Sequence, residues 1–529
     1  MGKTVTNNSC AHGNITIGVN RMKKLKNKTI VRDSEPIASN LLEVESSLRI
    51  RLCDCSDIVF RTFEIRRKVK FMLVFVDGMV DTKTLDESLL KPLIYYDLPH
   101  RLDGIRSLKD VVQGELLPVA QAKTVSTMND AIKELLKAGV VVFLDGERTA
   151  LAINMQGGQE RAIEESTSEG NIRGPKDSFT EILRTNTTLL RRRIRNPALK
   201  VESKTVGEMT NTDIAIVYVA GVVDESVLEQ VRQRIDRINI DGILEAGYIE
   251  EFIEDSSFSP FPQVLNTERP DVAASSLLEG KVAIVIDGTP FVLIVPMTFW
   301  AAMQAPDDHS ERFLYATAIR WIRFILVFLS LTFPSFYVAA STFHPEMIPY
   351  RLMLSIANAR EVIPFPAVIE AFVMEFMFEC LREAGVRLPK SVGSAVTCVG
   401  SIVIGQAAVD AGIVSAPMVI VVSVTGIASF TVPRYSFGTS MRLLRFGVLF
   451  MAGWLGFFGI AVCLIFILCH LVTLESFGIP YMLPVAPAHA SMFKDVFIRV
   501  PRWKMNSRTF AVGWTNSRRK YSGKGHGET

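Results

Sequence analysis

The stretch VKFMLVFVDGMVD, residues 69–81, recurs later in the chain as DIAIVYVAGVVD, residues 213–224. In each copy an apolar run typical of a buried strand leads into a glycine, an aspartate and a helix-like stretch. A second pair of segments repeats in the same order, LLKAGVVVFLDGERTALAI at 135–153 and LLEGKVAIVIDGTPFVLIV at 277–295. The region therefore contains an internal duplication.

The duplication predicts two related α/β subdomains, at residues 36–165 and 210–290. Two copies of this size do not make a solenoid, which needs at least about three short repeats. Residues 166–209 contain the polar, helix-forming stretch DSFTEILRTNTTLLRRRIRNPAL (177–199), which predicts a helical linker. Residues 1–35 are polar and basic with no apolar segment behind them, which favours a flexible tail and excludes a secretory signal peptide.

An Asp-Gly pair interrupts each copy of the second repeated segment, at Asp145-Gly146 and Asp287-Gly288. Asp-Gly between two apolar runs predicts a two-residue hairpin turn of type I′, in which both residues adopt positive φ. Turn formation accounts for both aspartates, so we do not interpret either one as catalytic.

The composition divides the chain into a soluble half and a membrane half. With 48% hydrophobic residues and a mean hydropathy of +0.26, the 529 residues are too apolar for an ordinary soluble enzyme. With 21% charged residues they are too polar to lie in a membrane throughout, and a net charge of +3 does not favour nucleic acid. The seven cysteines do not form a disulfide framework, and the C-x-C at Cys53 and Cys55 has no neighbouring histidine. We therefore predict no metal and no cofactor.

An all-α, multi-pass membrane domain is predicted at residues 291–475. Roughly 20 apolar residues cross the ~30 Å hydrocarbon layer as a helix. The runs that meet this length predict four spans, at 321–343, 392–413, 415–433 and 446–471. Two further apolar segments, 291–302 and 363–389, leave the count between four and six, because the first is short and the second carries several charges.

The charges predict the orientation. Residues 494–529 contain nine Lys/Arg and two acids, so the tail at 476–529 is expected in the cytoplasm, as is the N-terminal half. Both ends on one side require an even number of crossings. Arg434, Arg442 and Arg445 do not fit, because they fall in a loop that an even count places outside; burial or pairing with acidic groups would account for them.

Glu375, Glu379 and Glu383 are spaced at i, i+4 and i+8, so they share one face of a helix. One interpretation is the solvated face of an amphipathic helix in the membrane interface. The other is a row of carboxylates that lines a cation path when several copies assemble.

Gln406 and Asp410 lie one turn apart in an otherwise uncharged span, where a charge is costly and usually faces a bundle interior or a water path. Alternatively Asp410 ends its helix near the lipid headgroups, because Gly412 and Pro417 follow closely. No phosphate-binding loop, dinucleotide fingerprint, zinc-protease motif or nucleophile elbow occurs, so we predict no enzymatic activity and no catalytic residues.

Long runs of this chain resemble the A subunits of GerA-type spore germinant receptors. The membrane half carries PSFYVAASTFHPEMIPYRLMLSIANAREVIPFPAVIEAFVMEFMFECLREAGVRLPKSVGSAV at 334–396, and the soluble half carries IRGPKDSFTEILRTNTTLLRRRIRNPALK at 172–200. The likeness covers roughly residues 60–510 in family order. The stage V sporulation homologues of the A subunit share this architecture, and the arginine-rich stretch and the basic tail favour the receptor subunit.

The resemblance implies a multi-pass protein in the inner membrane of the bacterial spore. It implies a B subunit, an integral membrane protein that takes the nutrient, and a C subunit, which is a lipoprotein. It further implies that the A subunit forms a homo-oligomer that conducts ions as germination begins.

Three alternatives stay open: an accessory sporulation channel, a solute transporter and a membrane scaffold that conducts nothing. A transporter would be expected to show inverted repeats with matching broken helices. The GQAAVDAG break at 405–412 has no second copy, which disfavours that reading.

Overall fold

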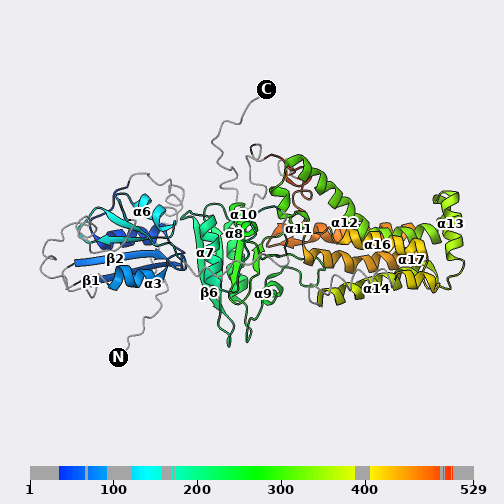
Figure 1. The fold of residues 1–529 in the computed structure, drawn as a ribbon, viewed down its shortest axis with the longest axis horizontal. Coiled ribbons are helices and arrows are strands. Elements are labelled where there is room, and N and C mark those ends of the chain that lie inside the picture. Colours follow the sequence, from blue (N-terminus) through cyan, green and yellow to red (C-terminus); the bar gives the residue numbers. More distant parts are fainter. Residues whose placement is uncertain are drawn as a thin grey trace, which may run out of the picture. The chain divides into compact units, whose positions relative to one another are not determined.

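The computed structural model describes residues 35–65, 69–91, 122–157, 169–170, 173–387, 405–488, 493, 495–501 and 503. The described residues form two compact units, and Figure 1 shows their helices and strands. The first unit takes the described residues within 35–50, 59–76 and 80–156. The second takes 51–58, 77–79 and the described residues from 157 onward.

The first unit is a five-stranded sheet with helices. Its sheet has the order β1-β2-β4-β5-β3, and the pairs β2/β4, β4/β5 and β3/β5 are antiparallel. Its core consists of alternate strand residues such as Phe71, Leu73 and Phe75, packed on Leu85 and Leu89. Its elements are α2 (Leu41–Arg51), β1 (Ile58–Ile65), β2 (Val69–Val76), α3 (Thr82–Leu85), the π-helix η1 (Asp86–Leu90), β3 (Ala122–Val125), α6 (Met128–Leu135), β4 (Gly139–Leu144) and β5 (Ala150–Asn154).

The second unit contains a sheet of the same topology, with the order β6-β7-β9-β10-β8. This agreement confirms that the N-terminal half is α/β with two sheets, as the duplication predicts. The elements are α7 (Leu183–Arg193), β6 (Leu199–Val206), β7 (Thr212–Val219), α8 (Glu225–Asp236), α9 (Ala246–Ile253), β8 (Leu265–Thr267), α10 (Pro270–Leu278), β9 (Val282–Ile286) and β10 (Val292–Val295).

Both faces of this second sheet are covered. Successive side chains of a strand point to opposite faces, and on β7 Ala215 and Val217 pack with α7 and α10 while Ile214 and Ile216 pack with α8. A strand that is buried on both sides needs an apolar residue at every position. This explains why the repeated segments read as continuous apolar runs rather than alternating ones.

The linker predicted at 166–209 is wrong, because its helix belongs to the second repeat. In the first unit Asp145 Oδ1 accepts a hydrogen bond from the backbone N–H of Leu41, at the start of α2 (3.3 Å). In the second unit Asp287 Oδ1 accepts one from Leu183, at the start of α7 (2.9 Å). The two pairs have the same sequence separation of 104 residues. Helix α7 is therefore the counterpart of α2.

The predicted two-residue turns are also wrong. Residues 145–149 and 287–291 separate the strands of each hairpin, and only Gly146 and Gly288 have positive φ, at 87° and 88°. The aspartates do not have positive φ, and their side chains accept hydrogen bonds from the start of a helix. The connections are therefore longer loops built around one left-handed glycine.

A segment from the first half of the chain completes the second unit. Cys55 pairs in parallel with Val201 of β6, and the Asp57 carboxylate makes a bidentate ion pair with Arg191 of α7, at 2.7 and 2.9 Å. Both charged side chains are only 1% exposed. Residues 51–58 are thus fixed to the second unit by a buried charge pair.

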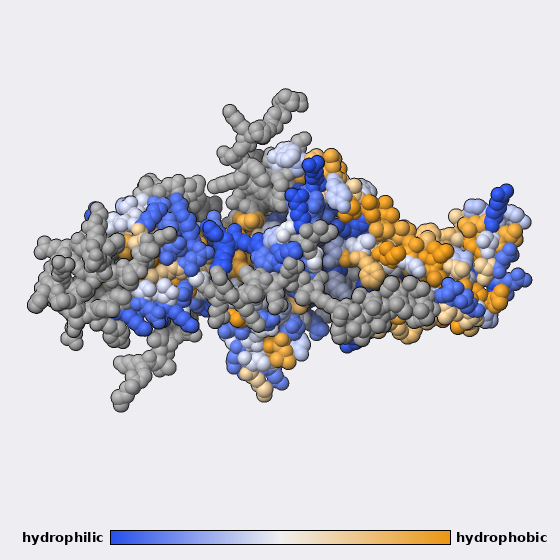
Figure 2. Space-filling view, viewed as in Figure 1, coloured by the Kyte–Doolittle hydropathy of each residue, from blue (hydrophilic) through white to orange (hydrophobic). Residues whose placement is uncertain are grey.

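The rest of the second unit is helical. Two of its helices, α12 and α17, are long and apolar enough to cross a membrane, and α16 is a shorter apolar helix. Figure 2 shows hydrophobic side chains over the surface of this part. The elements are α11 (Phe299–Met303), the 3₁₀ helix η3 (Pro306–His309), α12 (Phe313–Thr342), η4 (Pro345–Met347), α13 (Tyr350–Arg360), α14 (Ala367–Arg387), α16 (Ala416–Ser429) and α17 (Tyr435–Thr473).

Helix α17 turns back on itself at Gly456, whose φ of 60° and ψ of −140° are not helical. The Phe261 ring lies 6.2 Å from the ring of Phe437 and 6.0 Å from that of His470. In a straight helix these two residues would be roughly 50 Å apart. The span predicted at 446–471 is therefore not one helix but parts of two antiparallel arms, 435–455 and 457–473.

The other membrane predictions have mixed outcomes. Residues 321–343 coincide with α12 and 415–433 with α16, whereas most of 392–413 lies outside the described residues. The segment 291–302 is not a membrane segment, since it forms β10 and the start of α11. The segment 363–389 contains α14.

The tail predicted from residue 476 is not free over its described part. It forms the short strands β11 (Glu475–Ser476) and β12 (Ile479–Pro480), which pair with each other. Phe477 and Tyr481 are fully buried, and Asp495 lies against Arg320 of α12. The packed part of the chain thus reaches at least to the residues around 499.

Candidate functional site

A cluster of charges joins α14 to the first arm of α17. Glu375 Oε2 lies 3.1 Å from Arg445 Nη2, and Glu379 Oε1 lies 3.0 Å from the same nitrogen. Arg442 Nη1 lies 3.6 Å from Glu379 Oε2. Glu375 and Arg445 are at most 1% exposed, so removing Arg445 leaves the Glu375 carboxylate buried without its partner, whereas removing Glu375 leaves Arg445 paired with Glu379 alone. Helix α14 runs antiparallel to this arm, because Val368 packs on Gly453 at the other end of the contact.

The structure separates the remaining candidate residues from this cluster. Glu383 is 61% exposed and pairs with Arg387 one turn later, at 2.6 Å. Gln406 Nε2 donates to Asp410 Oδ1 at 3.0 Å, and both side chains are exposed. The described helical run 405–410 stops at Asp410, followed by Gly412 with a φ of 65°. Asp410 therefore lies at a helix end, as one of the two alternatives expects.

The arginines that did not fit the predicted topology all have acidic partners. Arg442 and Arg445 lie within α17 rather than in a loop, and Arg434 immediately precedes it. Arg434 pairs with Glu169. Pairing rather than exposure explains these charges.

Sequence reasoning missed Glu370, a buried carboxylate that accepts three hydrogen bonds from two other parts of the chain. It is 1% exposed and accepts hydrogen bonds from Arg360 Nε (3.1 Å) and from the Ser415 N–H and Oγ (3.1 and 2.8 Å). It ties α13 and α14 to the start of α16. Its position in an apolar run was the available signal, but Glu370 does not share the i, i+4 spacing of Glu375, Glu379 and Glu383.

A second buried charge cluster lies at the start of α12. Asp308 of η3 pairs with Arg320 and Arg323 at 3.1 and 2.9 Å, and Arg320 also pairs with Asp495 at 3.2 Å. Burial alone would raise the pKa of Asp308, but the hydrogen bonds and charges of Arg323 and Arg320 outweigh it and hold that pKa below its usual value. This cluster fastens the C-terminal segment to α12.

The loop at residues 254–263, here called the junction loop, connects the second sheet to the helical hairpin of α17. Ser259 Oγ lies 2.9 Å from His470 Nε2 of the second arm. The Pro260 carbonyl accepts a hydrogen bond from Ser440 of the first arm. Between them the Phe261 ring contacts side chains of both arms. One short loop therefore holds both ends of the hairpin.

The C-terminal segment closes the other side of the junction loop. Tyr481 donates its hydroxyl to the Pro262 carbonyl, and Ser476 Oγ donates to the Gln263 carbonyl, both at 2.8 Å. The Phe477 N–H donates to Asp255 at 2.6 Å, and Asp255 also pairs with Arg234 of α8. The loop is thus bonded to α8, to both arms and to the C-terminal segment.

The junction loop is stiffened from inside by Gln263, whose side chain is fully buried. Its Oε1 accepts from the N–H groups of Asp255 and Ser256 (3.1 and 2.9 Å), and its Nε2 donates to the Ser256 carbonyl (2.7 Å). Since one side chain satisfies three backbone groups, the loop has little freedom to move alone. A displacement of the sheet would therefore be passed to the hairpin.

A second link joins the sheet to the start of α17. Besides its pair with Arg434, Glu169 accepts from Thr267 Oγ1 of β8 at 3.0 Å. Burial raises the pKa of Glu169, and the charge of Arg434 opposes that rise. The first arm is thus attached at two points.

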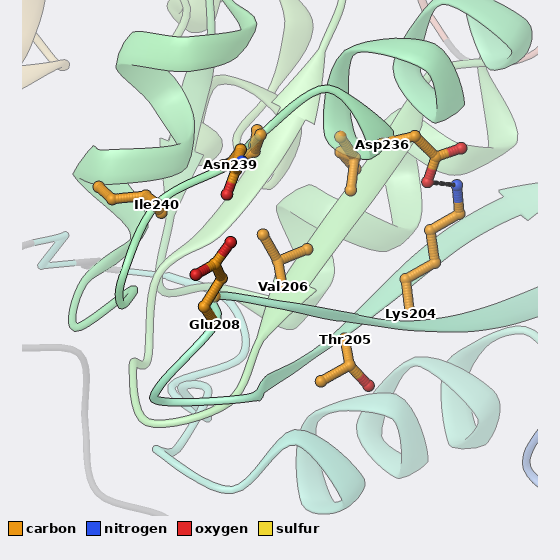
Figure 3. Close-up of a pocket in the computed structure, with 10 residues that line it drawn as sticks. Lys204, Thr205, Val206, Glu208, Asp236, Asn239 and Ile240 are labelled. Carbon is orange, nitrogen blue, oxygen red and sulfur yellow. Dashed lines mark hydrogen bonds and ion pairs between the residues drawn. The ribbon is translucent and has the colours of Figure 1, made fainter.

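The described residues offer little for small-molecule chemistry. A hollow of about 260 Å³ lies beside the β6–β7 turn. Lys204 pairs with Asp236 on one side of it, and Glu208 and Asn239 lie on the other side (Figure 3). No group of three or more metal-ligating side chains occurs within the described ranges. The buried charge clusters and the junction loop are therefore the candidate functional features.

Comparison with known proteins assigns the family. A family model described as Bacillus/Clostridium GerA spore germination protein matches residues 46–511. "Uncharacterized membrane protein YfkQ" of Bacillus subtilis (strain 168) is 46% identical over 473 residues, 89% of this chain and 91% of that protein. "Spore germination protein KA" of the same organism is 44% identical over 481 residues, 90% of this chain and 87% of that protein.

Among solved structures, a match is the crystal structure of the N-terminal domain of the A subunit of the Bacillus megaterium spore germinant receptor GerK3. It is 31% identical, has a TM-score of 0.40, and the match covers 51% of this chain and 99% of that domain. A two-sheet α/β half followed by an apolar helical part is the class that the fold defines. The chain belongs to the GerA spore germination protein family.

Proposed function

We propose that this chain is the A-type membrane subunit of a spore germinant receptor and that it helps to trigger spore germination. The family match and the relatives named as spore germination proteins support this assignment. Under this proposal it works beside an integral membrane B subunit and a lipoprotein C subunit. Its soluble half and its C-terminal end lie in the cytoplasm, and its helices lie in the inner membrane of the spore.

The junction loop is the observation that carries the mechanism. Because this loop binds both arms of α17, a change in the α/β half reaches both arms at once. The first arm carries Arg445, which holds Glu375 and Glu379 of α14. In this proposal a germinant signal shifts the hairpin, loosens that charge cluster and lets an assembly of copies release cations.

Neutralising the cluster tests this mechanism. The variant Glu375→Gln/Glu379→Gln/Arg445→Met removes all three charges together, so neither Glu375 nor Arg445 is left buried without the other, although Arg442, whose side chain is 11% exposed, loses its contact with Glu379. Potassium release from spores carrying it, measured after germinant addition, should change at least about tenfold in rate, since a few kcal/mol of coupling between the two states is lost. Potassium release at the wild-type rate would rule the mechanism out.

The exposed pair provides the matched control. Glu383→Gln removes a carboxylate of the same helix that pairs only with Arg387, so potassium release should stay at the wild-type rate. Immunoblots of the inner membrane should give equal amounts of both variants and the wild type. A variant that is missing from the membrane would be replaced by Glu379→Gln alone, which leaves the Glu375–Arg445 pair in place.

Oligomeric mass in nanodiscs, with the B and C subunits co-expressed, tests the conducting assembly. A closed homo-oligomer that conducts cations in a bilayer recording supports the proposal. A single copy bound to its partners with no conductance would leave this chain a coupling scaffold.

A further inference from the structure

Helix α9 presents an apolar stripe to solvent on the soluble part of the second unit. Ala246, Ile249 and Ile253 face the core and are buried. Away from that face Tyr248 and Phe252, spaced at i and i+4 of the helix, are 42% and 50% exposed, and Leu244, which precedes the N-cap Glu245, adds a third exposed apolar side chain at 72%. A helix needs only one apolar face to pack on its own sheet, so this second face is not explained by folding.

The surroundings of the stripe are strongly acidic. The segment 241–255, DGILEAGYIEEFIED, holds six acids and no lysine or arginine. Glu245 and Glu251 are exposed beside the stripe. Asp255 is neutralised by Arg234 of α8, but the exposed Glu245 and Glu251 keep the outer side of α9 acidic in a chain whose net charge is +3.

These two properties together restrict what can cover the stripe. A bilayer with anionic headgroups would be repelled by the acids. A protein surface that presents apolar side chains flanked by lysine or arginine satisfies both the stripe and the charges. Positive charge of this kind is concentrated in the cytoplasmic loops of integral membrane proteins.

We propose that the outer face of α9 docks a Lys/Arg-rich cytoplasmic loop of the integral membrane B subunit. The inference rests on the proposed function, because it places the α/β half in the cytoplasm beside that subunit. The junction loop begins at residue 254, directly after α9 ends at Ile253. A loop docked on α9 therefore acts on the segment that holds both arms of α17.

Photo-crosslinking of the full-length chain tests the docking. The chain carrying p-benzoylphenylalanine at position 248, an aromatic in place of Tyr248, is co-expressed with its B and C subunits and irradiated in membranes. The expected product is a crosslink to a cytoplasmic loop of the B subunit, located by mass spectrometry. The matched control places the same probe at Leu278 of α10, which is 48% exposed on the opposite face of the sheet and should give no such product.

Co-purification provides a second readout. Tyr248→Ser/Phe252→Ser and, separately, Glu251→Lys should each lower the B subunit retained in detergent by about tenfold, the loss expected when one interface anchor is removed. Leu278→Ser and Glu208→Lys are exposed changes elsewhere on the same unit and should retain it fully.

The outcomes separate this proposal from the proposed function. If the wild type retains the B subunit and residue 248 crosslinks only to lipid, only to a second copy or to nothing, the docking is overturned and the receptor assignment stands. If the wild type retains no B subunit at all, both are overturned.

Discussion

At the scale of single residues, the charged groups of this protein are defined by their partners rather than by their positions in the sequence. Glu375 and Glu379 were found from helical spacing, yet their partner Arg445 lies 66 to 70 residues later. Spacing within a helix can be read from neighbouring residues, whereas a contact between helices joins residues that are far apart in the sequence. The sequence therefore predicted the carboxylate row and allowed acidic partners for Arg442 and Arg445, but it did not predict that the two groups pair with each other.

Glu250 of α9 should make stability depend on pH. Burial, with the charges of Glu254 and Glu251, raises its pKa to about 7. The folded state thus keeps a proton that the unfolded state has lost, so stability falls as pH rises from the ordinary glutamate range to about 7. Glu250→Gln should be about 1–3 kcal/mol more stable than the wild type at pH 8, at about 1.4 kcal/mol per pKa unit, with little difference at pH 4.5.

Thermal unfolding of the full chain in nanodiscs at the two pH values measures this difference. Glu208→Gln, an exposed change in the β6–β7 turn, is the control and should have no effect at either pH. A Glu250→Gln variant with the same advantage at both pH values would contradict the explanation by proton binding.

At the scale of elements, the structure shows which patterns the sequence can reveal. The repeated strands were found because each is a continuous apolar run. Helix α7 was taken for a linker because its buried face includes Asn186, Thr187, Thr188 and Arg191, which hydrophobic periodicity cannot recognise. The break at Gly456 was missed because the residues on both sides of it are apolar and typical of one span.

Gly456→Ala should destabilise the helical hairpin. A side chain at its φ of 60° and ψ of −140° is strained, and a Cβ there would lie 3.1 Å from Phe343. We expect a loss of about 1–3 kcal/mol, measured by thermal unfolding in nanodiscs. Gly447→Ala, in the first arm with nothing near its Cβ, is the control and should be neutral or stabilising by up to about 1 kcal/mol.

An unchanged unfolding temperature for Gly456→Ala would mean that the chain does not reverse there. Residues 435–473 would then form one continuous helix instead of two antiparallel arms.

At the scale of the whole molecule, the two sheets share one topology, but the apolar helices are attached to the second sheet. The overall division into an α/β half and an apolar helical part was predictable from composition and repetition. The attachment of the helices to the second sheet was not, because it depends on single side chains such as Gln263 and Tyr481 that are far apart in the sequence.

The buried pair of Asp57 and Arg191 fixes residues 51–58 to the second unit, and its loss should be costly. Arg191→Met leaves Asp57 buried without its partner and should destabilise the chain by about 3–5 kcal/mol. Arg191→Met/Asp57→Leu removes both charges and should recover most of this loss. Limited proteolysis within 51–58, together with thermal unfolding in nanodiscs, distinguishes them; equal behaviour of the single and double variants would contradict this role of the pair.

The closure of the junction loop by Ser476, Phe477 and Tyr481 also has a consequence for biosynthesis. These residues, and Asp495 at the base of α12, are synthesised after both sheets and both arms of α17. During translation the sheets can fold while the hairpin is still held from one side only. A chain that terminated between Thr473 and Ser476 would therefore reach the membrane with the junction loop bonded to the arms but not to Ser476, Phe477 and Tyr481.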